Sequence, residues 1–158
     1  MFRVLFVFSP NLSESFDFAK APGHLVRRAQ QIAVALFMAE LAAEDVTPVQ
    51  FAILNAVMDT PGIDQITLAG RVAFDAATSG SVIGRLESKG WIKREPHEID
   101  RRRKLLWLTP AGHSATLQMK TAVERVQENF LKPLSPEESE HLAALLSKLV
   151  TGHEQKIS

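Results

Sequence analysis

The stretch TLAGRVAFDAATSGSVIGRLESKGWIKREPHEIDRRRKLLWL, residues 67–108, decides how this chain folds. Its first part predicts a short helix whose apolar side is formed by Leu68, Val72 and Phe74. The chain breaks at Asp75, whose carboxylate can cap a following helix by accepting hydrogen bonds from backbone N–H groups two or three residues later. The pattern therefore predicts a helix, a tight turn and a second helix.

The second helix is predicted to bury one face and to end at a glycine. Val82, Ile83 and Leu86 recur at helical spacing and mark the buried face. Gly90 follows as the residue after the last helical turn, where a left-handed backbone is common. The face away from this stripe carries small or long polar residues, which leaves it available to a partner.

A two-stranded hairpin with a basic tip is predicted after this helix. Trp91 and Ile92 begin one strand, and Leu106 and Leu108 alternate along the other. The loop between them is HEIDRRRK, residues 97–104. A helix of small residues followed by a basic hairpin is the layout of a winged helix-turn-helix, in which the helix enters the major groove and the wing reaches phosphate or the minor groove. The segment therefore predicts binding to double-stranded DNA.

Each part of this pattern has a plainer interpretation. Two short helices joined by a turn occur in many helical proteins, and an arginine run is more often a solvated surface. The charge distribution favours the DNA-binding interpretation. Residues 65–104 contain nine Lys/Arg and five Asp/Glu, a net charge of +4, so the rest of this formally neutral chain carries −4. Attraction to phosphate depends on this local field rather than on the total charge.

Composition excludes several other classes of function. The chain has 158 residues, 46% of them hydrophobic, which suits one compact unit with a real core. The absence of cysteine excludes disulfides and Cys-ligated zinc, and it fits the cytoplasm. No apolar run reaches membrane-spanning length. The five histidines lack metal-ligand spacing, and there is no phosphate loop or nucleophile elbow, so we expect neither an enzyme nor a cofactor or metal site.

The flanking segments are predicted to be mostly helical. Residues 1–21 are expected to form an N-terminal arm, possibly mobile, whose apolar start MFRVLFVF could instead be a strand. Residues 22–46 are expected to form the first dimerisation helix. The winged helix-turn-helix occupies residues 47–108, and residues 109–158 hold two further dimerisation helices. Capping boxes are predicted at Thr47 with Gln50 and at Ser135 with Glu138, and Thr109 is predicted to cap the helix after the wing. Leu142, Leu145, Leu146 and Leu149 give the last helix more apolar surface than one neighbour covers. This surplus favours a homodimer, with an ordinary bundle within one chain as the alternative.

The chain from about residue 22 to 150 resembles the MarR family of bacterial transcriptional regulators. The matching segments are PGHLVRRAQQ (22–31), TPVQFAIL (47–54), residues 67–94, DRRRKLLWLTPAG (100–112) and SPEE (135–138). The resemblance implies a homodimer that binds pseudo-palindromic operator DNA. It further implies a repressor released by a small phenolic or aromatic acid or by cysteine oxidation, and this chain has no cysteine. The alternative is a constitutively bound architectural DNA-binding protein without an effector.

We expect the DNA contacts to come from the second helix and the wing. The predicted residues are Thr78, Ser79, Ser81 and Arg85 on the helix, and Arg101, Arg102 and Arg103 on the wing. Ser79 could instead turn inward, and Arg85 could form a salt bridge to Asp100. Asp100 would repel phosphate, so its expected role is structural, orienting Arg85 or Arg102. Alternation along a hairpin means that the three wing arginines cannot all point the same way.

An effector site is predicted near the start of the first long helix. His24 and Arg28 suit a carboxylate, and Phe51 or Trp107 could wall an aromatic ring. The alternative is that the arginines there are solvated and that His24 packs locally. The sequence therefore predicts an aromatic-acid site at His24, Arg28 and Phe51.

Overall fold

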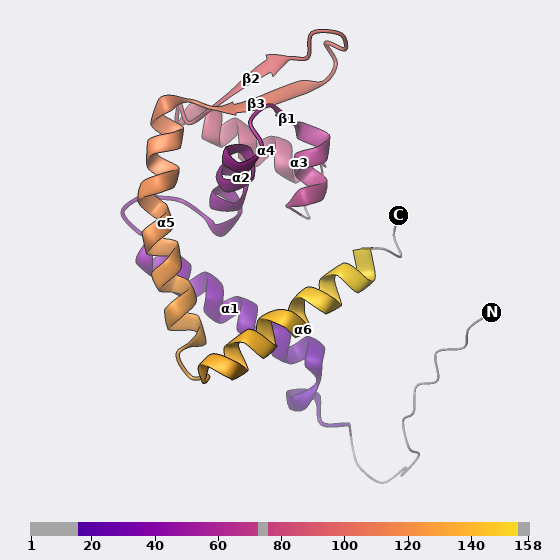
Figure 1. The fold of residues 1–158 in the computed structure, drawn as a ribbon, viewed down its shortest axis with the longest axis vertical. Helices are drawn as coiled ribbons and strands as arrows, with labels where there is room; N and C mark the ends of the chain where they lie inside the picture. Colours follow the sequence, from indigo (N-terminus) through magenta and orange to yellow (C-terminus); the bar gives the residue numbers. More distant parts are fainter. Residues whose placement is uncertain (1–15, 73–75, 155–158) are drawn as a thin grey trace, which may run out of the picture. The chain divides into compact units, whose positions relative to one another are not determined.

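The computed structural model describes residues 16–72 and 76–154. The chain divides into two compact units, residues 1–31 and residues 32–158. Most of the described residues are helical, with one small antiparallel sheet, as the sequence predicts (Figure 1). The elements in order are η1 (Phe18–Lys20), α1 (Pro22–Glu40), α2 (Pro48–Asp59), β1 (Ile63–Asp64), α3 (Gln65–Arg71), α4 (Ala76–Ser88), β2 (Ile92–Pro96), β3 (Lys104–Leu108), α5 (Pro110–Leu131) and α6 (Pro136–Glu154).

The first unit contains η1 and the beginning of α1. Asp17 caps η1, because its carboxylate accepts a hydrogen bond from the backbone N–H of Ala19 at 3.1 Å. The Phe18 ring lies 4.5 Å from the imidazole of His24, centroid to centroid. Residues 18–20, near the end of the predicted arm, form a short 3-10 helix. Residues 1–15 of the predicted arm lie outside the described residues.

Side-chain caps begin the helices of the second unit, as predicted. The Thr47 hydroxyl accepts from the Gln50 backbone N–H at 3.3 Å, and the Gln50 side chain accepts from the Thr47 N–H at 2.9 Å. Ser135 and Glu138 form the same reciprocal box at 2.8 and 3.3 Å. Thr109 caps α5 with a hydrogen bond of 3.0 Å. Each cap satisfies N–H groups that have no partner inside the helix.

Helix α1 ends earlier than the helix predicted over residues 22–46. It stops at Glu40, and a turn over residues 41–45 follows in which Asp45 has a φ of 49°. Leu41, the first residue of this turn, and Val46, which follows it, are each only 1% exposed, so both ends of the turn are held in the core. The Lys89 ammonium also donates to the Asp45 backbone carbonyl and lies 3.3 Å from its carboxylate. Tertiary contacts thus end a helix whose apolar spacing continues in the sequence.

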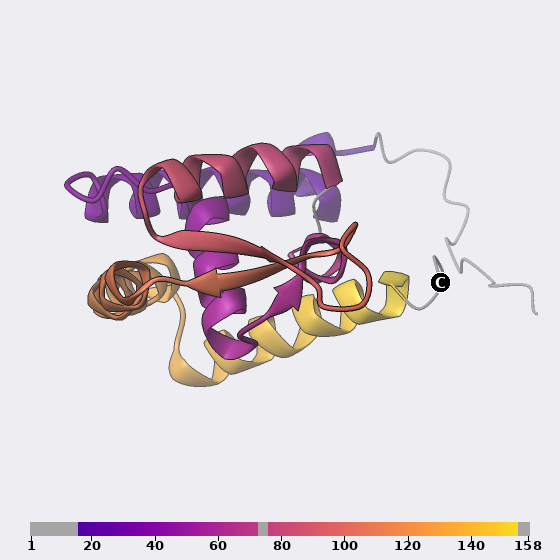
Figure 2. The same cartoon turned by 90° about the horizontal axis from the view of Figure 1, so that it is seen from above.

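The sheet has three strands rather than the predicted two, in the order β1-β3-β2. Ile92 pairs with Leu108 across β2 and β3, and Ile63 of β1 pairs with Leu106 on the other edge of β3. A strand of two residues is too short to show alternation, which is why the sequence did not reveal β1. Figure 2 shows α4 running alongside the β2–β3 ribbon, and the two elements are in contact.

The end of α4 is formed as predicted. Gly90 has a φ of 74°, and its N–H donates to the Glu87 carbonyl at 2.8 Å. The Trp91 N–H donates to the Leu86 carbonyl at 3.0 Å, which completes the glycine-based helix stop. Asp75, the predicted cap at the start of this helix, lies outside the described residues.

The core of the second unit lies beneath the sheet and the helix-turn-helix. Its fully buried residues include Ile53, Leu54, Leu68, Ile83, Leu86 and Leu106, each 0% exposed. On α5 the buried face begins with Gly112 and Thr116. The reason is close backbone packing, because a Cβ on Gly112 would lie 2.0 Å from the Trp91 carbonyl oxygen. Gly112 lets the start of α5 lie directly against the chain that leads into β2.

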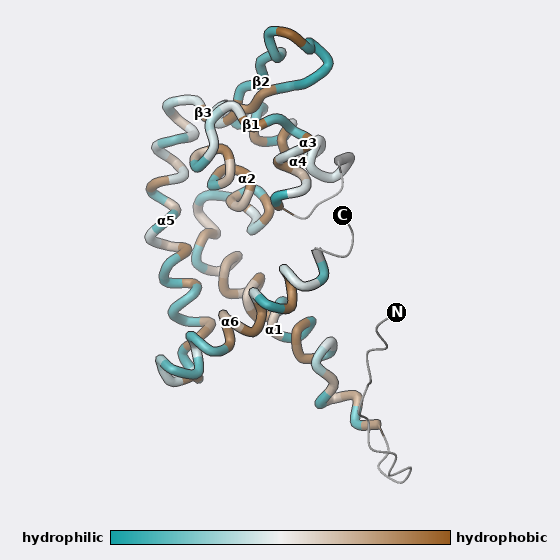
Figure 3. The backbone as a smooth tube through the Cα atoms, turned by 45° about the vertical axis from the view of Figure 1, so that its right-hand side comes forward, coloured by the Kyte–Doolittle hydropathy of each residue, from teal (hydrophilic) through white to brown (hydrophobic). Residues whose placement is uncertain are grey.

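Helix α6 presents an apolar face that this chain leaves uncovered. Leu145, Leu149 and Val150 are 51%, 55% and 56% exposed. Figure 3 shows hydrophobic and hydrophilic segments alternating along α6. Exposed apolar area at helical spacing is typical of a protein–protein interface.

Candidate nucleic-acid interface and ligand pocket

Helix α4 carries a polar stripe on its exposed face. Thr78, Ser81, Arg85 and Ser88 recur every three or four residues and are all exposed. The opposite face is fixed in the core by Ile83 and Leu86, so the helix cannot rotate to hide the stripe. Small hydroxyl side chains let another molecule approach the helix backbone closely, and Arg85 adds a positive charge.

Ser79 does not belong to this stripe. Its side chain is 0% exposed, and its hydroxyl oxygen has no hydrogen-bond partner. Ser79 lies four residues before Ile83 and seven before Leu86, on the buried face. The prediction that it contacts DNA is therefore wrong for this structure, and the inward orientation left open by the sequence is the one observed.

Arg85 is exposed and does not form the salt bridge to Asp100 considered as an alternative. Asp100 instead shapes the tip of the wing: its carboxylate accepts from the Arg102 backbone N–H at 3.1 Å, and its carbonyl accepts from the Arg103 N–H at 3.0 Å. Asp100 thus bonds to the backbone of Arg102 and not to a guanidinium, and its predicted role in orienting Arg85 or Arg102 remains a prediction.

The wing tip is also held by His97. Its Nδ1 accepts from the backbone N–H groups of Ile99 at 3.2 Å and Asp100 at 3.3 Å. The backbone N–H of His97 closes the loop by donating to the Arg103 carbonyl at 3.0 Å. These bonds leave Arg101 and Arg102 exposed at the tip. Figure 3 shows hydrophilic colours over most of this loop.

Arg103 differs from the other two wing arginines. Its guanidinium lies 2.8 Å from the Asp64 carboxylate, whose side chain is only 11% exposed. Asp64 caps α3 by accepting from the backbone N–H groups of Ile66 and Thr67, each at 3.1 Å, and from the Thr67 hydroxyl at 2.6 Å. This ion pair attaches the wing to the helix-turn-helix, while the Arg103 side chain stays 46% exposed, so its contact with DNA remains a prediction.

The same network lowers the pKa of Asp64. The hydrogen bond from the Thr67 side chain has the largest effect, and the Thr67 backbone and Arg103 act in the same direction against the opposing effect of burial. Together they bring the pKa of this carboxyl from 3.8 to about 2. Asp64 was not predicted as a functional residue. An aspartate just before a helical pattern is nevertheless a known N-cap signal, so its capping role could have been predicted from the sequence.

Arg94 is a second residue that the sequence analysis missed. Its Nε lies 2.9 Å from the Glu87 carboxylate, and its Nη2 donates to the Gly80 carbonyl at 3.4 Å. Both partners are on α4, so Arg94 ties strand β2 to the helix that carries the polar stripe. This role follows from the packing of β2 against α4, which sequence patterns do not predict.

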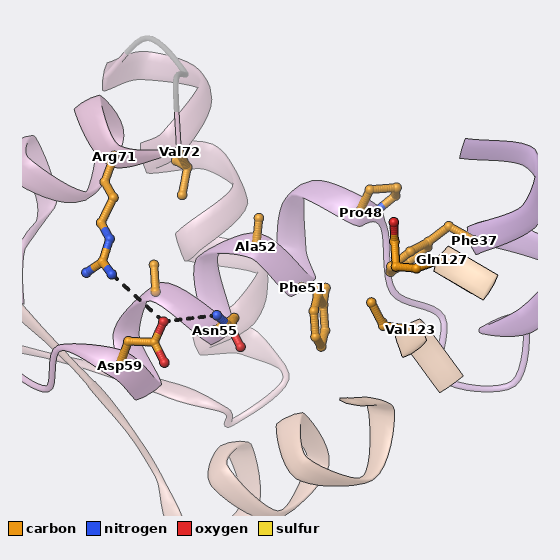
Figure 4. Close-up of a pocket in the computed structure, with 11 residues that line it drawn as sticks. Phe37, Pro48, Phe51, Ala52, Asn55, Asp59, Arg71, Val72, Val123 and Gln127 are labelled. Carbon is orange, nitrogen blue, oxygen red and sulfur yellow. Dashed lines mark hydrogen bonds and ion pairs between the residues drawn. The ribbon is translucent and has the colours of Figure 1, made fainter. Parts of the chain in front are cut away.

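A pocket opens beside the helix-turn-helix within the second unit. It has a volume of about 500 Å³. The rings of Phe37 and Phe51 lie 6.2 Å apart in its wall. Arg71, Asp59 and Asn55 form its polar end (Figure 4). The remaining lining residues are Pro48, Ala52, Ala56, Val72, Val123 and Gln127.

The predicted effector residues are divided between the two units. Phe51 lines the pocket of the second unit, whereas Trp107 lines a separate pocket with Met58 and His113. His24 and Arg28 belong to the first unit. There His24 packs against Phe18, and its Nδ1 lies 3.4 Å from Arg27 Nη2, which is the local packing considered as the alternative.

No group of three or more metal-ligating side chains comes together in residues 16–72 and 76–154. Within the same ranges, no helix combines the length and apolar character needed to cross a bilayer.

Comparison with known proteins identifies close relatives. The MarR family model matches residues 46–104. The transcriptional regulator HosA of Escherichia coli is 33% identical over 127 residues, covering 80% of this chain and 93% of HosA. BpsR of Bordetella bronchiseptica, whose DNA binding is regulated by 6-hydroxynicotinic acid, superposes with a TM-score of 0.83 at 30% identity, covering 87% of this chain and 98% of BpsR. The regulator PcaV of Streptomyces coelicolor, solved with its natural ligand, gives 0.80 at 33%, covering 87% and 97%.

Proposed function

This chain belongs to the MarR family of transcriptional regulators, and we propose that it is a homodimeric repressor that leaves its operator DNA when a small aromatic acid binds. The observation that carries the proposal is the pairing of two exposed polar surfaces in one unit. One is the polar stripe of α4, and the other is the basic tip of the wing. As a DNA-bound regulator it would act in the cytoplasm.

Each surface has a defined role in the proposed complex. Thr78, Ser81 and Arg85 of α4 enter the major groove, where hydroxyls and a guanidinium bond to base edges and phosphates. Arg101 and Arg102 of the wing contact phosphate or the minor groove beside it. Arg103 holds the wing in place through its ion pair with Asp64.

The dimer is proposed to form through the terminal helices. The leucine face of α6 is exposed in a single chain, and a second copy would remove its apolar area from water. Two-fold symmetry would then present two α4 helices to successive major grooves, about one turn of DNA apart. This arrangement requires an operator with two related half-sites.

The effector is proposed to be a small aromatic acid. The pocket of the second unit has aromatic walls at Phe37 and Phe51, and it lies beside α3 of the helix-turn-helix. The regulation of BpsR by 6-hydroxynicotinic acid supports this class of ligand. We retain Phe51 as a wall of this site. The ligand-binding roles of His24 and Arg28, which belong to the first unit, remain predictions from the sequence.

The test starts from duplexes that tile the DNA on both sides of the coding region. Fluorescence anisotropy should identify one or more duplexes bound more tightly than a shuffled duplex of equal length, and an acid such as 4-hydroxybenzoate should weaken that binding. A thermal-shift measurement with the same acids should show a raised melting temperature, because a ligand of the native state stabilises it by mass action. Selective DNA binding without any response to such acids would favour the constitutive architectural protein instead.

A further inference from the structure

One charged residue lines the polar end of the pocket from each of two helices. Among the described residues around the pocket, Arg71 is the only cation and Asp59 the only acid. Their closest N–O distance is 3.8 Å, too long for a hydrogen bond. Asp59 is instead bonded to the Asn55 amide at 3.1 Å, and Arg71 donates through Nη1 to the Thr60 hydroxyl at 2.7 Å. Figure 4 shows Arg71 reaching from the end of α3 toward Asp59 on α2.

Arg71 can therefore donate further N–H hydrogen bonds to a ligand. A guanidinium carries five N–H groups in a planar fork that matches a carboxylate with two parallel hydrogen bonds. One of its terminal nitrogens is engaged by Thr60, and the other faces Asp59 beyond bonding distance. The Arg71 side chain is 47% exposed, so it is accessible to a ligand and not locked in a buried network.

We propose that Arg71 binds the carboxylate of the aromatic acid and that Asp59 competes with this carboxylate for the guanidinium. The inference rests on the proposed function, because it assigns a residue and a mode of regulation to the same pocket. The ligand ring would occupy the space beside Phe51, with its carboxylate directed at the end of α3. The Asp59 carboxylate then lowers ligand affinity in two ways: it repels the ligand carboxylate, and it attracts the Arg71 guanidinium.

The position of Arg71 in the chain links this contact to DNA. Arg71 is the last residue of α3, its C-cap Val72 also lines the pocket, and α4 begins at Ala76. A ligand that draws Arg71 away from Thr60 and Asp59 therefore acts on the end of α3 that leads into the DNA-contacting helix. The ligand lowers DNA affinity only if it favours a position of α3 and α4 that fits the groove less well.

Calorimetry with benzoate and 4-hydroxybenzoate on purified variants tests the inference. Arg71→Gln should weaken acid binding by about ten- to a hundredfold, since a hydrogen-bonded charge pair is lost. Arg71→Lys, which keeps the charge without the fork, should be intermediate. Asp59→Asn should tighten binding by about two- to fivefold, the size expected for one exposed like-charge contact. A gain in affinity is a result that a purely structural role for this pair would not produce.

Two controls make the result specific. Arg125→Gln removes an arginine whose Nε lies 2.6 Å from Glu40 and which does not line the pocket, so it should leave acid binding unchanged. Arg28→Ala tests the cation predicted from the sequence: weaker acid binding by this variant, with Arg71→Gln unchanged, would move the carboxylate contact to Arg28 and overturn the assignment of Arg71. Equal affinities for wild type and Arg71→Gln would overturn the assignment of Arg71 while leaving the effector class intact. A wild type that binds neither acid would overturn the effector class and this inference together.

Discussion

The guanidinium of Arg103 lies 2.8 Å from the carboxylate of Asp64, and this ion pair joins the wing to the N-cap of α3. The wing and the helix-turn-helix are also connected through the short pairing of β1 with β3 and through Arg94 of β2, which bonds to Glu87 and Gly80 of α4. A wing held at one place on the helices can present Arg101 and Arg102 at a fixed distance from α4. In the proposed mode of DNA binding, this pair would act indirectly, by positioning the wing.

Asp64 should give the protein a pH-dependent stability. Its pKa is lowered to about 2 in the folded state from 3.8, so its contribution is fully present above about pH 5 and is lost as the pH falls toward 2. The shift corresponds to about 2 kcal/mol at pH 7. Asp64→Asn keeps a capping side chain but not the charge. Urea unfolding should therefore show a difference from wild type of about this size at pH 7, roughly halved at pH 3. A difference that stays constant over this range would rule out the carboxylate as its source.

Ser79→Ala should stabilise the protein. The buried Ser79 hydroxyl has no hydrogen-bond partner, and its removal eliminates a desolvated polar group at almost constant shape. We expect a gain of about 1 kcal/mol in the free energy of unfolding, with DNA affinity unchanged. Ser81→Ala, on the exposed face, is the matched variant and should weaken DNA binding instead. Weaker DNA binding by Ser79→Ala would mean that this residue turns outward in the complex.

Gly112→Ala should destabilise the protein although alanine favours helices. The propensity gain is about 1 kcal/mol, but a Cβ would lie 2.0 Å from the Trp91 carbonyl oxygen, and forced overpacking costs about 1–3 kcal/mol or more. The control is Gly70→Ala on α3, where a Cβ meets nothing within 4 Å and should be neutral or stabilising. Thermal unfolding of the two variants measures the contrast, and equal melting temperatures would refute the close approach.

Sequence patterns predicted the elements whose signals are local. The capping box at Thr47 and Gln50, the glycine stop at Gly90 and the hairpin between Ile92 and Leu108 depend on neighbouring residues, and all three are confirmed. Strand β1 was missed because its two residues carry no periodicity. The end of α1 was placed too late, because tertiary contacts around Asp45 override the apolar spacing.

The candidate site was predicted less completely, for a physical reason. Residue type indicates which side chains can bind DNA, but not which are already engaged elsewhere. Arg103 looks the same as Arg101 in the sequence, and only the pairing of β1 with β3 brings Asp64 to it. The sequence left open whether Ser79 turns inward, and only the orientation of α4 in the structure shows that Ser79 is buried while Ser81 is exposed. Arg71 gave no signal of its own, because its pocket is assembled from distant segments.

The leucine face of α6 should hold the dimer together. Leu145→Glu combined with Leu149→Glu places charges on a face that is half exposed in one chain, and it should produce a monomer at micromolar concentration in analytical ultracentrifugation. Deletion of the residues after Pro133 should likewise leave a monomeric or aggregating product. Ser147→Glu, away from the leucine face, is the control and should remain dimeric. A well-behaved dimer from the double variant would place the interface elsewhere.

The most direct test of the account is the salt dependence of binding to the duplex identified in the flanking DNA. Wing arginines that neutralise phosphates release condensed counterions, so log affinity should fall linearly with log salt. Arg101→Ala combined with Arg102→Ala removes four arginines from a dimer and should reduce the magnitude of the slope by about 3 to 4 if all of them contact phosphate. The control Arg125→Ala should leave the slope unchanged. A double variant with the wild-type slope would show that the wing does not contact DNA and would contradict the proposed mode of binding.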